Sequence, residues 1–253
     1  MRGTAILVAT VMTTAATVGA DGDSEPVDAV ERSPIEIIES IVPEVLEDTN
    51  PEPTVLPANL ADGYQIATTD GLVTINVPGA DGPAVDLGDG ATSYETGEVD
   101  TDTVLLQTTS GDVRVLKVIA GTEAPSRFEF SVSDPSIKLV TTPTGHVEFR
   151  RDGIGIATIA PPWAFDSSQH PVSTRYIVDG SSFFLEVDHQ SAEVSYPVVA
   201  DPIPAVIWIW GARFVLGAIV SKATKWVYER RGYTCPWWAS YWNVWFGCYK
   251  RAG

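Results

Sequence analysis

Basic residues, histidine and cysteine are all scarce in this sequence of 253 residues, and each shortage weakens a class of function. Sixteen Lys and Arg against 33 Asp and Glu give a net charge of -17. A nucleic acid, itself a polyanion, repels a chain of that sign, so no nucleic-acid partner is expected. The three histidines and two cysteines show no metal-site spacing, and no nucleophile elbow, zinc-binding helix or phosphate loop is present. We therefore expect a non-enzymatic protein without metal or cofactor.

The charge that is present is divided unevenly along the chain. Residues 1–202 carry 32 carboxylates and nine basic side chains, a net charge of -23, whereas residues 203–253 carry Glu229 against seven basic residues, a net charge of +6. Seven of the eight tryptophans and both cysteines also lie after residue 202. This division predicts an acidic body followed by a cationic, tryptophan-rich tail.

The first 20 residues have the features of a secretory signal peptide. Arg2 supplies the charged start, a short apolar run follows, and Val18-Gly19-Ala20 offers the small residues that a signal peptidase reads, with cleavage after Ala20. A membrane anchor is the alternative, but four threonines interrupt a run already shorter than the roughly 20 apolar residues that span a bilayer. We expect a secreted protein, in which a disulfide between Cys235 and Cys248 is favoured.

Residues 21–62 form an acidic, proline-rich segment with one short predicted helix. The segment holds twelve carboxylates and a single basic residue, Arg32, so it cannot bury enough apolar surface to order its whole length. Ser33 to Glu36 reads as a capping box with Pro34 at the first helical position, and Pro43 should kink or restart the helix. Four side chains share one face of that helix: Ile38, Ile41, Val42 and Val45. The helix either docks on the body or shields a basic partner such as the tail.

From residue 63 to residue 202 the apolar pattern alternates, which predicts a body of about ten short strands arranged as an antiparallel β-sandwich. The pattern indicates a strand over 128–132 and hairpins that join 103–107 to 113–118, 147–149 to 154–156 and 176–178 to 183–187. In the first hairpin, Val113, Val115 and Lys117 are predicted to share one face. The expected fold class is thus mainly β, with a partly helical N-terminal segment and a separate C-terminal module.

Four stretches of this body occur in a recognisable order: Pro161 to Asp166, Pro171 to Tyr176, Val187 to His189, and Tyr196-Pro197-Val198-Val199-Ala200-Asp201-Pro202. Their order resembles secreted actinobacterial proteins, mostly uncharacterised, some of which have a YPV-x-x-DP end before an unrelated C-terminal segment. Similar strand endings occur in large bacterial YD-repeat exoproteins. The resemblance implies a carrier or pro-region followed by a variable module, with the boundary just after Pro202, and it implies no catalytic residues.

Two weaker chemical interpretations concern polar side chains of the body. Asp81 and the turn Asp86 to Gly90 could offer oxygen ligands to calcium, but the spacing differs from an EF-hand loop and a solvated acidic turn is favoured. Each histidine, His146 included, is expected to be a loop residue. An exported hydrolase, with a site assembled from Asp166, His170, Asp188 and His189, is kept as the least favoured alternative.

The tail begins with an apolar run over residues 203–220 that contains one charge, Arg213. Its hydrophobicity is marginal for spanning a bilayer, so residence at the membrane surface is expected. A helix from about Ala205 to Arg230 would place Lys222 and Lys225 opposite Trp226, whereas Val206 to Trp210 also fits a strand. Both alternatives stay open at this stage.

The end of the tail poses a geometric choice between a hairpin and a helix. One helix would separate Cys235 from Cys248 by about 20 Å, whereas a disulfide needs Cα atoms within about 7 Å. A hairpin with the two cysteines opposite each other places Trp237 against Phe246 and Trp238 against Trp245, and we favour this hairpin. A helix with a Trp238, Tyr241, Trp242 and Trp245 stripe is the alternative for reduced cysteines.

The basic and aromatic residues of the tail predict a surface that is attracted to an anionic membrane or cell-envelope polymer and then inserts its rings at the water boundary. The candidate contact residues are Trp208, Trp210, Arg213, Lys222, Lys225, Trp226, Trp237, Trp238, Trp242, Trp245, Lys250 and Arg251. The acidic body is the expected intramolecular partner that keeps the tail quiet until a second cleavage near Pro202. The predicted function is a secreted precursor with a bacteriocin-like, membrane-active tail, and the alternative is an intact cell-envelope binding protein.

Overall fold

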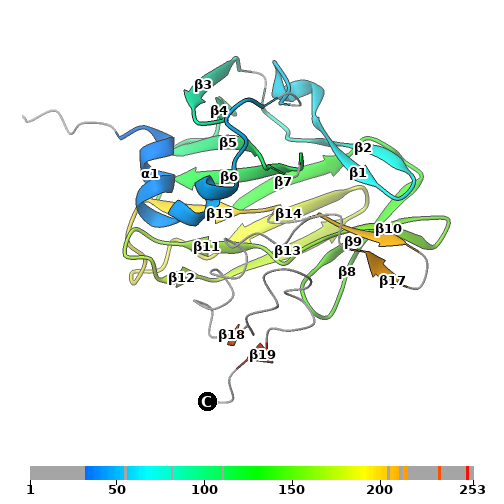
Figure 1. Ribbon diagram of the computed structural model, residues 1–253. Coiled ribbons are helices and arrows are strands. Elements are labelled where there is room, and N and C mark those ends of the chain that lie inside the picture. The colour runs from blue at the N-terminus through cyan, green and yellow to red at the C-terminus, as the bar shows by residue number, and fades with distance from the viewer. Residues whose placement is uncertain are drawn as a thin grey trace, which may run out of the picture. The chain divides into compact units, whose positions relative to one another are not determined.

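The computed structural model describes residues 32–53, 56–80, 82–109 and 111–203, together with the backbone of four short strands further on, at 206–210, 213–215, 233–234 and 249–250 (Figure 1). The chain divides into two units, residues 1–31 and residues 32–253. The predicted signal peptide belongs to the first unit and lies outside the described residues.

The second unit is mainly β, as predicted, and every strand pair among its described residues is antiparallel. Fifteen of its strands lie between residues 63 and 202, more than the ten expected, because several strands are only two to four residues long. The helical elements among the described residues are α1 (Pro34–Ile41) and the 3-10 helices η1 (Pro43–Asp48) and η2 (Leu60–Asp62). The strands are β1 (Tyr64–Thr68), β2 (Gly71–Asn76), β3 (Ala84–Gly88), β4 (Ala91–Tyr94), β5 (Thr101–Gln107), β6 (Val113–Ile119), β7 (Arg127–Val132), β8 (Ile137–Thr141), β9 (Val147–Arg151), β10 (Ile154–Ile159), β11 (Trp163–Phe165), β12 (Pro171–Val172), β13 (Thr174–Asp179), β14 (Ser182–Val187), β15 (Val198–Asp201), β16 (Val206–Trp210), β17 (Arg213–Val215), β18 (Tyr233–Thr234) and β19 (Tyr249–Lys250).

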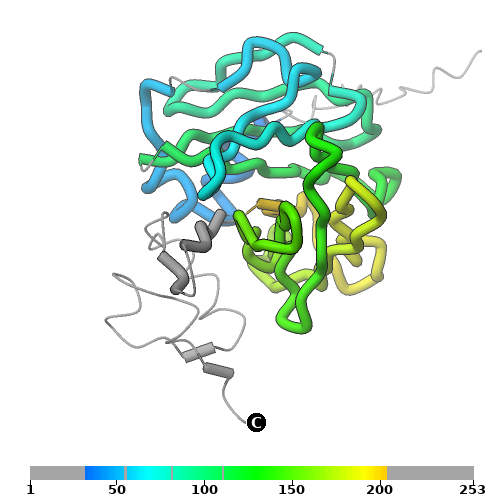
Figure 2. The backbone as a smooth tube through the Cα atoms, turned by 90° about the vertical axis from the view of Figure 1, so that its right-hand side faces the viewer, coloured from blue at the N-terminus to red at the C-terminus, as the bar shows by residue number. Residues whose placement is uncertain are grey.

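The strands that the structure describes form three larger sheets and one short pair. The largest sheet has the order β12-β11-β15-β6-β5-β4-β3, a second has the order β1-β2-β7-β14-β13, and a third has the order β17-β16-β10-β9-β8. In Figure 2 the strands coloured cyan to green gather in the upper part of the view and those coloured light green to yellow in the lower part. Strands β18 and β19 pair only with each other among the described strands.

The predicted hairpins are present with the expected turns. Asp152 and Gly153 connect β9 to β10 with φ values of 51° and 82°, the left-handed conformation that a two-residue hairpin turn needs and that glycine adopts without strain. Gly180 has a φ of 62° between β13 and β14. Strand β7 alternates between buried and exposed positions as the sequence predicted.

One apolar core connects the three sheets. Phe183 of β14 stacks on Phe130 of β7 with ring centroids 5.2 Å apart and meets the ring of Phe149 of β9 edge-on at 6.4 Å. Val115 of β6 belongs to the same buried cluster, which brings in the largest sheet. The sheets therefore share one interior, which is consistent with the predicted β-sandwich.

A second buried cluster lies beneath the N-terminal helix. Ser33 caps α1, since its Oγ accepts the Glu36 N–H and the Glu36 side chain accepts the Ser33 N–H, which confirms the capping box. The helix ends at Ile41, and η1 restarts at Pro43 because proline cannot donate to the previous turn. The predicted apolar face (Ile38, Ile41, Val42 and Val45) is buried against side chains of β5, β6, β11 and β15. The helix thus docks on the body.

Strand β6 is buried along its whole length, and its side chains alternate between the two clusters. Val113, Val115 and Ile119 face the core shared by the three sheets, while Leu116 and Val118 face the cluster under α1. The fully buried Lys117 lies on the first face, with its Nζ atom 5.0 Å from the Phe128 ring centre, as the shared face of Val113, Val115 and Lys117 predicted.

Candidate functional site at the junction of body and tail

The strand that precedes the tail ends at a buried ion pair. Asp201, the last residue of β15, is fully buried, and its Oδ2 lies 3.2 Å from Nε of Arg114 on the neighbouring strand β6. Its Oδ1 accepts the Ile203 N–H at 3.0 Å. Burial raises the pKa of Asp201 to about 7, although Arg114 and the Ile203 N–H both favour the charged form. The carboxylate therefore ties the end of the body to its central strand.

The backbone that follows Asp201 is also enclosed. Pro202 is buried and Ile203 is 1% exposed. The Tyr176 hydroxyl lies within hydrogen-bonding distance of two carbonyl oxygens, that of Pro202 and, at 3.0 Å, that of Ala160. The boundary predicted just after Pro202 thus falls in buried backbone, where a protease has no access unless this end of the body opens.

The backbone of the tail continues the third sheet. Strand β16 pairs with β10, with Ala157 opposite Trp208, and β17 pairs with β16, with Trp208 opposite Val215. The helix expected from about Ala205 is therefore wrong over these residues, and the strand alternative for Val206 to Trp210 is confirmed. Branched and aromatic residues at consecutive positions favour the extended backbone, and the edge of β10 supplies hydrogen-bonding partners.

The predicted membrane-contact residues are only partly within the described chain. Trp208 and Trp210 lie on β16, Arg213 on β17 and Lys250 on β19, and for these four positions the backbone alone is described. The other members of the set lie outside the described residues: Lys222, Lys225, Trp226, Trp237, Trp238, Trp242, Trp245 and Arg251. Cys235 and Cys248 lie outside them as well, as does the predicted aromatic hairpin.

The residues of the hydrolase alternative mostly bind backbone groups. Asp166 is 1% exposed, and its carboxylate accepts N–H groups from Ser168, His170 and Ser195 at 3.0, 2.8 and 3.2 Å. The His170 ring is 3.8 Å away and largely exposed. These contacts identify Asp166 as a residue that shapes its loop.

His189 has a comparable structural role. Its Nδ1 is 2.8 Å from the Tyr196 hydroxyl and its Nε2 is 3.2 Å from the Pro125 carbonyl oxygen, while Asp188 is exposed to solvent. Burial lowers the pKa of His189, although Pro125 and Asp188 oppose the shift. Both ring nitrogens are thus engaged in holding neighbouring loops together.

The calcium interpretation gains no support from the turn after β3. Oδ1 of Asp86 accepts the Gly88 N–H at 2.9 Å, which is a local turn contact, and Asp81 lies outside the described residues. Within the described part of the chain, no three His, Cys, Asp or Glu side chains come together as metal ligands. No helix in that part is long and apolar enough to cross a membrane.

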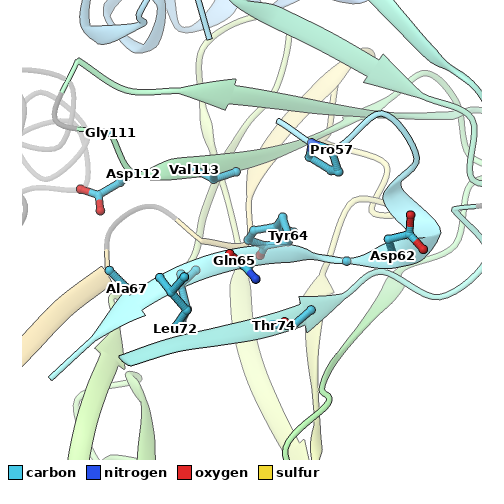
Figure 3. A pocket seen from close by; sticks show the side chains of 12 residues that line it. Pro57, Asp62, Tyr64, Gln65, Ala67, Leu72, Thr74, Gly111, Asp112 and Val113 are labelled. Atoms are coloured by element: carbon cyan, nitrogen blue, oxygen red, sulfur yellow. The ribbon is translucent and has the colours of Figure 1, made fainter. Parts of the chain in front are cut away.

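A groove of about 490 Å³ opens beside β1 (Figure 3). Gln65 and Ala67 of β1 line it, with Leu72 of β2 and the turn before β6 on either side. Figure 3 shows Asp62 and Asp112 at opposite ends of the view, with the apolar Leu72 between them. The groove therefore combines an apolar surface with two carboxylates.

The ion pair and the groove were both missed by the sequence patterns. Arg114 and Lys117 fall within an otherwise apolar strand, which is the signal that could have indicated buried cations needing acidic partners. Lys117 finds its partner in Glu98, at 2.6 Å, and also donates to the Thr103 hydroxyl at 2.8 Å. The groove is lined by residues that are distant in sequence, so no local sequence pattern predicts it.

Comparison with known proteins adds no relative, because no family model, no curated protein and no solved structure matches the chain. The inference about function therefore depends on the geometry and charge of this chain alone.

Proposed function

We propose that this chain is a secreted, non-enzymatic carrier whose acidic β-sandwich body bears a cationic, tryptophan-rich C-terminal module that acts on anionic membranes, as a bacteriocin-like peptide does. The observation that carries the proposal is the charge division, a net charge of -23 over residues 1–202 against +6 over residues 203–253. Basic residues attract anionic lipid, and tryptophan rings reside at the membrane interface.

The body and the tail carry opposite net charges, and a membrane can respond to the charge of one without responding equally to the charge of the other. At physiological ionic strength the charges of the body are screened over about 8 Å, so a membrane close to the tail responds mainly to the tail's own charge. An acidic body therefore does not prevent the cationic module from binding an anionic surface. The acidic body instead competes with that surface for the cationic module, and so lowers the affinity of the module for the surface.

We propose in addition that Cys235 and Cys248 form a disulfide that closes the aromatic hairpin. The support comes from the register of β18 and β19, in which Tyr233 lies opposite Lys250 and Thr234 opposite Tyr249. Continued by one residue, this register pairs position 235 with position 248. A mass increase of about 2 Da on reduction of the secreted chain tests the bond, and an unchanged mass would refute it.

The burial of the junction favours a second candidate, an intact cell-envelope binding protein. Asp201 and Ile203 are both buried, and β16 extends a sheet of the body, so release near Pro202 requires part of the body to open. If the tail stays attached, the same rings and cations bind lipid or stack on envelope glycans. Mass spectrometry of the secreted species separates the two candidates, because only a released module yields a fragment that begins near Ile203.

The shared claim is tested by sedimentation of the full secreted chain with vesicles. Vesicles containing about a third anionic lipid should bind the chain, and neutral vesicles should bind it weakly. Replacing Lys222, Lys225, Lys250 and Arg251 by Gln should abolish most of the preference, since each cation near the surface contributes about 1 kcal/mol. The matched control replaces four basic residues of the body, Lys138, Arg127, Arg150 and Arg175, by Gln. Equal binding to both vesicle types would refute membrane recognition by charge.

A further inference from the structure

The groove beside β1 lies along the open edge of a sheet. Strand β1 pairs with β2 on one side, and no strand among the described residues pairs with its other edge. Residues of β1, including Gln65 and Ala67, line the groove. An open strand edge is a ready hydrogen-bonding surface for another segment of chain.

The register shows which backbone groups of β1 face that edge. The Ser133 N–H donates to the Thr74 carbonyl at 3.2 Å, so the backbone groups of Thr74 point toward β7 and away from β1. Gln65 is the partner of Thr74 in the β1–β2 pair. In an antiparallel pair, the backbone groups of such a residue point to the opposite side, here the free edge, and Ala67 repeats the pattern two residues later.

The tail leaves the body close to this edge. Immediately after β1, the Thr69 N–H donates to the Ile156 carbonyl of β10 at 3.2 Å. The next residue of β10, Ala157, pairs with Trp208 of β16, and β16 also lies against β1. In Figure 3 the orange ribbon of the C-terminal strands passes beside the end of the groove marked by Ala67.

The chain beyond β17 is long enough to enter the groove. Val215 is separated from Ala157 by two strand spacings, about 10 Å. The seven residue-to-residue steps from Val215 to Lys222 reach up to about 23 Å. Because the chain just after β1 contacts β10 at Ile156, the end of the groove at Ala67 is within range of the segment 216–231.

The composition of that segment complements the groove. It carries Lys222, Lys225, Arg230 and Arg231 against one carboxylate, Glu229, and it contains the apolar Leu216, Ile219, Trp226 and Val227. The groove offers Asp62 and Asp112 around the exposed side chain of Leu72. The helix α1 is less well placed to receive the tail, since it covers the opposite face of the largest sheet from Val113, which lines the groove.

We propose that the groove along β1 is the docking site of the chain's own segment 216–231, with the basic side chains against Asp62 and Asp112 and the apolar side chains over Leu72. The inference rests on the proposed function, because docking here is how the body competes with a membrane for the tail. An anionic surface then displaces the segment without any cleavage.

The identity of the occupant is tested by zero-length carbodiimide coupling of the full secreted chain at low salt, followed by peptide mass spectrometry of the monomer. Amide cross-links from Asp62 or Asp112 to Lys222 or Lys225 are expected. Their absence would overturn the proposal, and so would their occurrence only in a covalent dimer, which would assign the groove to a second copy of the chain.

The contribution of charge is tested by hydrogen exchange at the amides of Gln65 and Ala67. In Asp62→Asn/Asp112→Asn these amides should exchange about three times faster than in the unmodified chain, because two surface ion pairs of ordinary strength are lost. The matched variant Glu123→Gln/Glu193→Gln removes two exposed carboxylates elsewhere and should leave the exchange unchanged. Equal rates in all three chains would contradict the docking.

Vesicle sedimentation separates this inference from the function on which it rests. The Asp62→Asn/Asp112→Asn chain should bind anionic vesicles about threefold more tightly than the Glu123→Gln/Glu193→Gln chain. If cross-links form but no chain binds vesicles, the docking stands and the proposed function is wrong. If all chains bind equally and no cross-links form, the function stands and the docking is wrong.

Discussion

The junction and the groove are two acidic regions of one body, and they differ in what surrounds their carboxylates. Asp201 at the junction is fully buried and held by Arg114, whereas Asp62 at the groove is exposed. A buried carboxylate fixes the backbone to which it belongs, while an exposed one is available to a partner. The end of β15 is therefore fixed within the body, and the docking proposed for the tail at the groove is the part that can respond to the surroundings.

The largest expected effect is a difference in the free energy of unfolding between two variants, one that lacks the Asp201 carboxylate and one that lacks the Asp62 carboxylate. Asp201→Ala should lower the free energy of unfolding by about 3–5 kcal/mol, because it removes the buried carboxylate that faces the Arg114 guanidinium. Asp62→Ala should change it by less than about 0.5 kcal/mol, as exposed substitutions usually do. Urea unfolding of both variants measures the difference.

The double variant Arg114→Met/Asp201→Leu sharpens this comparison. It removes both charges and keeps side chains of similar volume, so most of the lost stability should return. A double variant as unstable as Asp201→Ala would show that the single substitution acts through packing rather than through an uncompensated charge.

The second expected effect is a fall in the stability of the body as pH rises, caused by Asp201 at the junction. The pKa of Asp201 is raised from 3.8 to about 7, so between about pH 4 and pH 7 the folded chain binds a proton that the unfolded chain releases. The contribution of this group is full below pH 4 and is lost as pH rises toward 7, by up to about 1.4 kcal/mol per pH unit. Asp201→Asn should remove this slope.

His146 makes the free energy of unfolding change with pH in the opposite direction over part of the same pH range. A His146 variant is therefore the control for the pH measurement. Burial lowers its pKa to about 4, so the unfolded chain binds the extra proton and stability rises with pH between about 4 and 6.5. His146→Gln should remove only this rising component. Urea unfolding at pH 5 and pH 7 would contradict the assignment if Asp201→Asn kept the difference seen in the unmodified chain.

A smaller effect should follow from loosening the backbone at the junction. Tyr176→Phe removes the hydroxyl that binds the Pro202 and Ala160 carbonyls and should weaken this region by about 1 kcal/mol. Limited proteolysis near residue 203 should then become about fivefold faster. Tyr94→Phe is the matched control, since its hydroxyl donates to the Pro57 carbonyl at the groove, at 2.6 Å. Faster cleavage near residue 203 in the control as well would show a general loosening.

The smallest effect concerns the apolar surface of the groove. Leu72 is 64% exposed, so Leu72→Ala should change the free energy of unfolding by less than about 0.5 kcal/mol. If the tail covers this side chain, hydrogen exchange at Gln65 and Ala67 should still rise about twofold. Val99, 62% exposed and outside the groove, provides the control Val99→Ala. The same rate in both variants would remove Leu72 from the docking surface.

The local parts of this fold could be predicted from the sequence because their signals are local. Alternation fixed the strand over 128–132, Asp152-Gly153 marked a tight turn, and Ser33 with Glu36 marked the start of a helix. The sequence predicted the helix in the acidic segment and left open whether it docks on the body, and the helix is buried because β6 and β15 present an apolar face to it. That face is assembled from residues far apart in the sequence, so no window of residues contains it.

The junction was harder to predict for the same reason. Asp201 and Arg114 are separated by most of the body and meet only because β15 pairs with β6. The first tail strand was ambiguous between helix and strand until the free edge of β10 was available to pair with it. In both cases tertiary pairing decides what local propensity leaves open.

Strand β6 also determines how the body should come apart. Its odd-numbered positions complete the core shared by the three sheets and its even-numbered positions complete the cluster under α1. Neither cluster can lose this strand without exposing the other to water. Heating should therefore melt the body in a single cooperative transition, with both interiors lost at the same temperature.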